Sequence, residues 1–86
     1  MPERLTKARS RAVGARQTLK ALENGTAQVV FVARDAEERV VKPVEDLCRR
    51  QGAELVYVDN MRELGKYCSI NVGAAAAALL GDRPAR

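Results

Sequence analysis

Residues 28–33, QVVFVA, limit the possible folds of this chain more than any other segment. After the glutamine, apolar and β-branched residues follow one another without the alternation of a strand that has one solvent face. A short run of this kind indicates a strand buried on both faces, as in a sheet covered by helices on its two sides. Residues 54–58, ELVYV, predict a second strand of that sheet.

The segments around these strands carry helical patterns. Over residues 15–23 the apolar side chains recur at helical spacing. Residues 61–67 predict another helix, because Asn60 and Glu63 have the spacing of a capping box. Gly65 lies inside that helix, where glycine costs about 1 kcal/mol relative to alanine, and this indicates a site of close approach.

Pro43 divides the segment that joins the two strands. A proline inside a helix removes a backbone hydrogen bond and clashes with the preceding turn, whereas the first helical position tolerates it. We therefore predict a short turn over residues 37–41, where Asp35 and Glu38 have capping-box spacing. A main helix then begins at Pro43 and ends at Gly52.

The two ends of the chain and one alanine-rich segment complete the pattern. Residues 3–10 predict a short helix, residues 11–13 an edge strand and residues 81–86 a frayed tail. Residues 73–80, GAAAAALL, favour a helix by alanine propensity, but small residues also suit a strand on which helices pack closely. Strands that alternate with helices predict a single domain over residues 1–86, an α/β/α sandwich with a small mixed sheet.

Histidine is absent from the 86 residues, which excludes catalytic triads and proton relays that depend on it, and zinc sites with histidine ligands. Cys48 and Cys68 are too few for a zinc site made of cysteines alone, and we expect both to be reduced thiols in the core of a cytoplasmic protein. No apolar run reaches the roughly 20 residues that cross a bilayer. The charged start MPERLTKARSR lacks the apolar part of a secretory signal, so we expect no contact with a membrane.

The formal net charge is +4, and the positive charges gather near the start of the chain. Within the first 20 residues Glu3 is the only acid. The basic residues there are Arg4, Lys7, Arg9, Arg11, Arg16 and Lys20. Such a surface favours a polyanionic partner. The neighbouring carboxylates Glu37 with Glu38, and Glu45 with Asp46, have the pattern of a solvated surface, so we predict no enzyme.

Residues 14–20, GARQTLK, stand out as a candidate binding motif. Gly14 precedes a helix, whose first N–H groups are free and lie at the positive end of the helix dipole. Arg16 and Lys20 lie one turn apart on one face, with Gln17 beside them. Arginine suits the edge of guanine and lysine suits a phosphate. An ordinary charged helix face has the same pattern, and spacing alone leaves both interpretations open.

Four segments in order resemble the kink-turn RNA-binding family of the ribosomal protein seven-Ae superfamily, and most closely its short bacterial members. They are VGARQTLKALENG (13–25), QVVFVARDA (28–36), PVEDLCRRQGAELVYV (43–58) and MRELGKYCSINVGAAAAALL (61–80). The resemblance covers nearly the whole chain. It implies a three-layer α/β/α sandwich with a small mixed four-stranded sheet, in which residues 73–80 form the last strand.

The resemblance also implies a binding site at the start of the second helix. Family members insert this helix start into the widened major groove of a kink-turn, beside its tandem sheared G·A pairs. Gly14 corresponds to the family glycine and Lys20 to the family lysine, which contacts a phosphate or guanine. Arg16 and Gln17 stand where the family has Asn and Glu. Both retain the means to contact guanine, although a neutral Gln accepts a hydrogen bond less strongly than a carboxylate.

A second contact is implied for the loop after the helix at 61–67. Its residues are Cys68, Ser69, Ile70, Asn71 and Val72. In this interpretation Ile70 and Val72 pack on a flipped-out nucleotide, although both residues also suit the protein core. Lys66 and Arg34 flank the site as phosphate contacts.

These features together predict a monomeric cytoplasmic protein that binds kink-turn RNA and stabilises its bent form, with no cofactor, small-molecule substrate or catalytic residue. The RNA is ribosomal, or a structured non-coding RNA such as a riboswitch. The alternative is a protein-interaction domain of the same fold that has lost RNA binding. It would dock through the acidic residues around Glu37, Glu38, Glu45 and Asp46.

Overall fold

The computed structural model of the protein describes residues 11–68, 70 and 72–81. Strands and helices alternate along this part of the chain. They are β1 (Arg11–Val13), α2 (Ala15–Glu23), β2 (Ala27–Ala33), α3 (Glu38–Gln51), β3 (Glu54–Val58), α4 (Met61–Tyr67) and β4 (Ala76–Leu80). The helix predicted at 3–10 lies outside the described residues, as does the predicted tail beyond Gly81.

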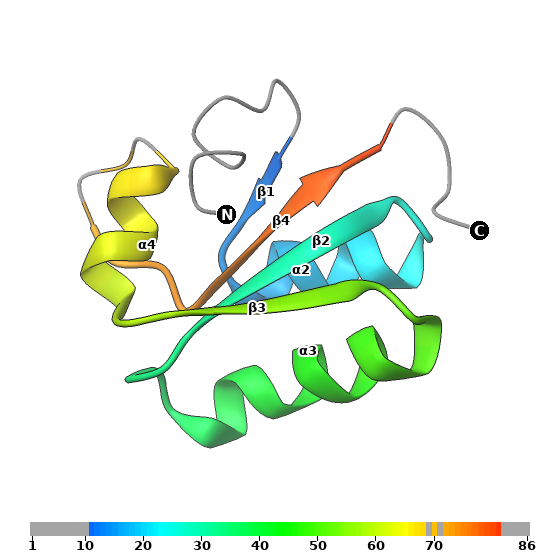
Figure 1. The fold of residues 1–86 in the computed structure, drawn as a ribbon, viewed down its shortest axis with the longest axis horizontal. Coiled ribbons are helices and arrows are strands. Elements are labelled where there is room, and N and C mark those ends of the chain that lie inside the picture. The colour runs from blue at the N-terminus through cyan, green and yellow to red at the C-terminus, as the bar shows by residue number, and fades with distance from the viewer. Residues whose placement is uncertain (1–10, 69, 71, 82–86) are drawn as a thin grey trace.

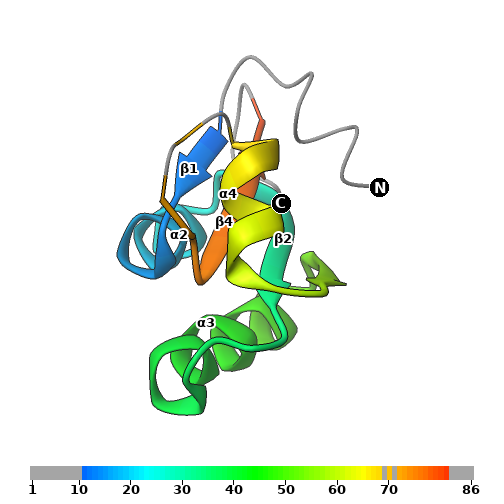
Figure 2. The same ribbon diagram turned by 90° about the vertical axis from the view of Figure 1, so that its left-hand side faces the viewer.

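The four strands form one mixed sheet in the order β1-β4-β2-β3. β2 and β3 are parallel, whereas β4 is antiparallel to both β1 and β2. α2 and α3 cover one face of the sheet and α4 covers the other (Figures 1 and 2). This arrangement confirms the predicted three-layer α/β/α sandwich and places the predicted strand 11–13 at an edge of the sheet.

The central strand β2 is buried on both faces, as its continuous apolar sequence predicts. Val29 and Phe31 face the core beneath α4, and Val30 and Val32 face the core beneath α2 and α3. Phe31, the single phenylalanine, is fully buried. The sheet therefore carries two separate apolar cores, one on each side.

The alanine-rich segment is a strand, β4, from Ala76 to Leu80. Ala76 and Ala78 pack toward α2 and α3, and Ala77 packs toward α4. All three alanines are fully buried. Burial between two helical layers overrides the helix propensity of alanine here, because the small side chains let both layers approach the middle of the sheet.

The prediction for the segment around Pro43 is wrong. α3 is one helix from Glu38 to Gln51 with Pro43 inside it, and its N-cap is Glu37. Pro43 has no N–H to donate to the carbonyl four residues earlier, that of Arg39, and Arg39 is an exposed residue. Asp35 does not cap this helix: its Oδ1 instead accepts a hydrogen bond from the Met61 N–H at 2.8 Å, which fixes the start of α4.

The start and packing of α4 follow the prediction. Asn60 Oδ1 caps the helix by accepting a hydrogen bond from the Glu63 N–H at 2.8 Å. Gly65 is buried, and a Cβ added there would overlap the carbonyl oxygen of Val72 and lie 3.3 Å from the Cα of Gly73. The glycine is therefore a site of close approach between α4 and the segment that leads into β4.

Candidate functional site

Two of the predicted contact residues, Gly14 and Arg34, lie at one end of the sheet, where β1, β2 and β3 end and β4 begins. Three backbone hydrogen bonds tie these ends together. They run from Gly14 N–H to Ala76 O (2.7 Å), from Ala33 N–H to Ala75 O (2.9 Å) and from Arg34 N–H to Val58 O (2.8 Å). We call this end of the molecule, which includes Gly14, Arg34 and Ala76, the α2-entry end. It brings together segments that are far apart in the sequence.

Gly14 makes the turn from β1 into α2. Its backbone has φ 98° and ψ 153°, a conformation that residues with a Cβ rarely adopt. Its N–H is used by Ala76, and its carbonyl accepts the first helical hydrogen bond from Thr18 N–H at 2.9 Å. The N–H groups that follow in the first turn have no helical acceptor, and the first turn contains no acidic residue. The start of α2 therefore suits a negatively charged ligand.

Arg16, Gln17 and Lys20 are all exposed on α2. Neither Arg16 nor Lys20 forms an ion pair with another described residue. On the inner face Thr18 is fully buried, and its hydroxyl has no hydrogen-bond partner in the described structure. The helix thus presents two available cations and an amide in the positions that the sequence predicts.

The loop after α4 divides its predicted contact residues between core and surface. Ile70 is half-buried against the core beneath α4, and its N–H donates to Gly65 O at 3.1 Å. Val72, in contrast to Ile70, is exposed over 71% of its surface. Ser69 and Asn71 lie outside the described residues. Of the two apolar candidates, Val72 is therefore the one available to a ligand.

Lys66 and Cys68 lie near the end of α4 with different exposure. Lys66 is exposed in the last turn of the helix. Cys68 is 3% exposed and belongs to the core beneath α4. Burial raises the pKa of its thiol, an effect that the charge of Arg11 partly opposes. The thiol of Cys68 is therefore not available to a ligand, and its N–H already donates to the carbonyls of Leu64 and Gly65.

Arg34, which the sequence predicts as a phosphate contact, also lies against an aromatic ring. Its guanidinium lies 5.4 Å from the centre of the Tyr57 ring. The Tyr57 hydroxyl donates to Glu45 Oε2 at 2.7 Å, and this hydrogen bond is the main reason that the pKa of Tyr57 is raised. The sequence analysis did not select Tyr57. A signal was present in ELVYV, because a tyrosine between two valines on a strand faces the opposite side from both.

The predicted acidic surface on α3 is not uniform. Glu37 lies 3.6 Å from Arg39, and Asp46 lies 3.8 Å from Arg49, both as exposed pairs. The carboxylate of Glu45 accepts a hydrogen bond from the hydroxyl of Tyr57. Acids and bases therefore alternate on this face, which gives an acidic docking partner or a basic one no continuous patch of opposite charge.

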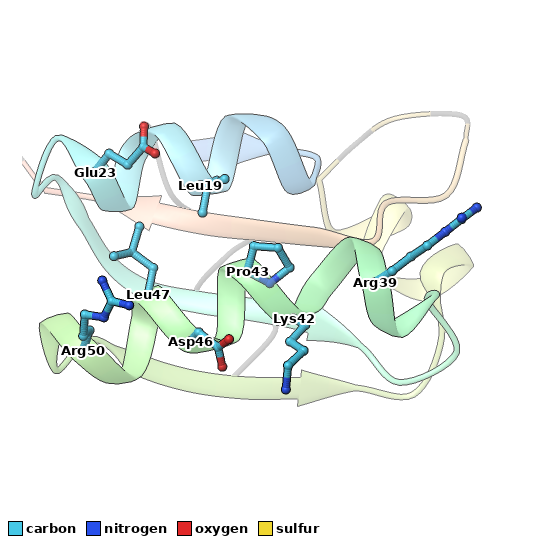
Figure 3. A pocket seen from close by; sticks show the side chains of 8 residues that line it. All are labelled: Leu19, Glu23, Arg39, Lys42, Pro43, Asp46, Leu47 and Arg50. Atoms are coloured by element: carbon cyan, nitrogen blue, oxygen red, sulfur yellow. The ribbon is translucent and has the colours of Figure 1, made fainter.

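A groove of about 500 Å³ runs between α2 and α3. Figure 3 shows Leu19, Pro43 and Leu47 between the two helices, with Arg39 at one end of the groove and Arg50 at the other. Glu23 and Asp46 also line it. Its charges are mixed, and it follows the length of the two helices, from Arg39 near the start of α3 to Glu23 and Arg50 near their other ends. Among the described residues there is no group of three His, Cys, Asp or Glu that could hold a metal ion, and no helix long and apolar enough to cross a membrane.

Comparison with known proteins gives a consistent result. The model of the ribosomal protein L7Ae/L30e/S12e/Gadd45 family matches residues 2–83. RNA-binding protein TTE2299 of Caldanaerobacter subterraneus subsp. tengcongensis is 51% identical over 74 residues, which is 85% of this chain and 90% of that protein. RNA-binding protein BH0128 of Halalkalibacterium halodurans is 46% identical over 77 residues, which is 90% of this chain and 94% of that protein.

The fold also matches a solved structure, that of the Giardia lamblia 15.5kD RNA binding protein. The TM-score is 0.82 with 23% sequence identity, over 93% of this chain and 68% of that one. At this identity the match bears on the fold alone. The names of the family and of the two sequence relatives are those of RNA-binding and ribosomal proteins rather than of enzymes, in agreement with the prediction.

Proposed function

The chain belongs to the ribosomal protein L7Ae/L30e/S12e/Gadd45 family, and from this membership and the geometry of the α2-entry end we propose that it binds RNA. The observation that carries the proposal is the start of α2. There a glycine with positive φ opens the helix, free N–H groups follow, and Arg16 and Lys20 stand exposed without ion-pair partners among the described residues. These are the groups that contact phosphates and guanine edges.

The proposed target is a kink-turn, an RNA motif with tandem sheared G·A pairs beside a bulge. The start of α2 would enter its widened major groove, with Arg16 and Gln17 at the G·A pairs and Lys20 on a phosphate. Val72 supports the proposal from a second direction, because an exposed apolar side chain at the same end can pack on an unstacked base. The RNA would then be bound by two chemically different contacts, the polar groups at the start of α2 and the apolar side chain of Val72.

Binding of this kind acts on the RNA by population shift. A kink-turn samples extended and bent forms, and a protein that fits only the bent form shifts the equilibrium by its differential affinity. No catalytic group is required. We further propose that the protein acts as a monomer in the cytoplasm, on ribosomal RNA or on another structured non-coding RNA.

The test is a titration of the protein into an RNA that carries one kink-turn, with a fluorescent donor and acceptor on its two arms. We expect energy transfer to rise as the bent form accumulates. The control is the same RNA with its G·A pairs replaced by Watson–Crick pairs, for which transfer should stay unchanged. Equal binding to both RNAs would show a nonspecific basic surface. No binding to either at moderate salt would favour the protein-interaction alternative.

A further inference from the structure

We propose that Arg34 and Tyr57 form a third RNA contact, beside those of the start of α2 and of Val72: a platform on which one unpaired nucleobase stacks outside the kink-turn core. The proposal rests on the proposed RNA-binding function and extends it to a site on the α3 side of the sheet. Its basis is the pairing of an exposed arginine with an exposed aromatic ring at the α2-entry end.

The platform is built from the ends of two neighbouring parallel strands. Arg34 directly follows β2, Tyr57 lies in β3, and Ala33 pairs with Val58 in the register of the two strands. The guanidinium lies 5.4 Å from the ring centre, within the range of a cation–π contact. Aromatic rings and guanidinium planes are the surfaces on which proteins stack unpaired bases.

Tyr57 is both exposed and held in place. Its exposed fraction is 39%, whereas Phe31 is fully buried and Tyr67 is half-buried, so it is the most exposed aromatic ring of the described residues. The hydrogen bond to Glu45 fixes the far end of its side chain at 2.7 Å. A stacking surface that is already ordered loses less conformational entropy when a base binds.

The position suits an RNA bound at the start of α2. Gly14 directly follows β1, and β4 and β2 lie between β1 and β3 in the sheet. Neighbouring strands are about 4.8 Å apart, so the ends of β1 and β3 are separated by about 14 Å. Unpaired nucleotides that leave the kink can cover this distance.

A hollow of about 320 Å³ adjoins the platform. Its lining includes the apolar residues Val32, Ala36 and Val41 and the carboxylates of Glu38 and Glu45, of which Glu45 accepts the hydrogen bond of Tyr57. Glu38 is exposed and makes no ion pair with a described residue. A carboxylate accepts hydrogen bonds from an exocyclic amine, so we expect adenine, guanine or cytosine to bind better than uracil.

The test uses kink-turn RNAs with a short unpaired extension in which 2-aminopurine replaces one base at a time. Stacking quenches the fluorescence of 2-aminopurine. With the wild-type protein we expect quenching at one position of the extension. Tyr57→Ala should abolish it and weaken binding of the extended RNA at least about fivefold. Tyr57→Phe keeps the ring and should retain the quenching. Both variants should bind the unextended kink-turn like the wild type.

A charge-matched pair of variants separates stacking from general electrostatics. Arg34→Gln should reduce quenching, whereas Arg62→Gln removes an exposed arginine from α4, on the opposite face of the sheet, and should not. If the wild type bends the kink-turn but no position is quenched, the platform proposal is wrong. The same holds if Tyr57→Ala and Tyr57→Phe behave alike. If the wild type does not bend the kink-turn, it is the proposed function that fails.

Discussion

The start of α2 and the loop after α4 lie near the same end of the sheet but are built in different ways. The start of α2 is polar and regular: a glycine turn, a helix, and three exposed polar side chains in its first two turns. The loop depends on tertiary contact. It packs on α4 through Gly65, places Ile70 in the core and leaves Val72 71% exposed.

The difference shows how one surface can combine two kinds of recognition. Charges and backbone N–H groups on a helix supply affinity for a phosphate backbone. An apolar residue placed by close packing supplies shape, because its position depends on contacts elsewhere in the molecule. Substitutions should therefore damage the two regions in different ways.

Gly65→Ala should have the largest effect. The new Cβ would meet the carbonyl of Val72, a backbone atom that cannot move without displacing the loop. We expect a loss of about 2–3 kcal/mol in the free energy of unfolding. The affinity for kink-turn RNA should fall as well, because Val72 moves. Denaturant unfolding and the energy-transfer titration measure the two effects.

Gly52→Ala is the matched control for this substitution. Gly52 also needs glycine, since its φ is 72°, but an added Cβ there would meet no atom within 4 Å. We expect a loss of about 1 kcal/mol in stability and no change in RNA affinity. Unchanged affinity for Gly65→Ala at a temperature where it is folded would show that the loop does not bind RNA.

Arg16→Ala tests the helix side of the comparison. Arg16 is exposed and has no ion pair with a described residue, so its removal should leave stability nearly unchanged. If it reads guanine, affinity for a kink-turn should fall by about 1–3 kcal/mol. The preference for G·A over Watson–Crick pairs should also fall. A variant that discriminates as well as the wild type would remove Arg16 from base recognition.

Ile70→Ala and Val72→Ala should have opposite effects on stability and RNA binding, although both residues belong to the same loop. Ile70 is half-buried in the core, so its truncation should lower the free energy of unfolding by about 1–2 kcal/mol. Val72→Ala should change stability by less than about 0.5 kcal/mol, because the side chain is exposed, but should weaken RNA binding. The reverse result would mean that the loop is arranged differently from the structure.

Lys20→Ala measures the electrostatic contribution of α2 to RNA binding. A lysine on a phosphate releases one counterion when the complex forms. Its loss should reduce the slope of log K against log salt by about one, with little effect on sequence preference. Titrations at several salt concentrations measure the slope. An unchanged slope would place Lys20 away from the phosphates.

The smallest effect is expected for the reactivity of the two thiols, which tests whether the loop after α4 stays packed. Cys48 and Cys68 are both buried and unpaired, and burial raises the pKa of each thiol, so the reactive thiolate is scarce at neutral pH. We expect neither to react with an alkylating reagent until the protein unfolds. Faster labelling of Cys68 than of Cys48 would reveal that the loop lifts from α4.

Much of the fold follows from local pattern. The continuous apolar run gave β2, and the periodicity of residues 15–23 gave α2 with the same bounds. The strand at β4 needed the family resemblance, because alanine propensity alone favours a helix. The break predicted at Pro43 is absent: the proline stands inside α3, where burial of Val41 and Val44 on either side of it outweighs one missing hydrogen bond.

The candidate site likewise contains residues that could be predicted from the sequence and residues that could not. The cations of α2 could be selected from the sequence, because helical spacing fixes which residues share a face. The division between Ile70 and Val72 could not, since both are β-branched apolar residues in one loop. The contact of Arg34 with Tyr57 was also out of reach, because it joins residues 23 positions apart through the register of two parallel strands.

The most direct test of a shared RNA surface at the α2-entry end is to record amide chemical shifts while unlabelled kink-turn RNA is added to the isotope-labelled protein. We predict that the amides of residues 14–20 and 72–76 shift most, and that Asn24, Gly25 and Gly52, at the opposite ends of α2 and α3, stay unchanged. Large shifts confined to those opposite ends, or equal small shifts over the whole surface, would contradict the account.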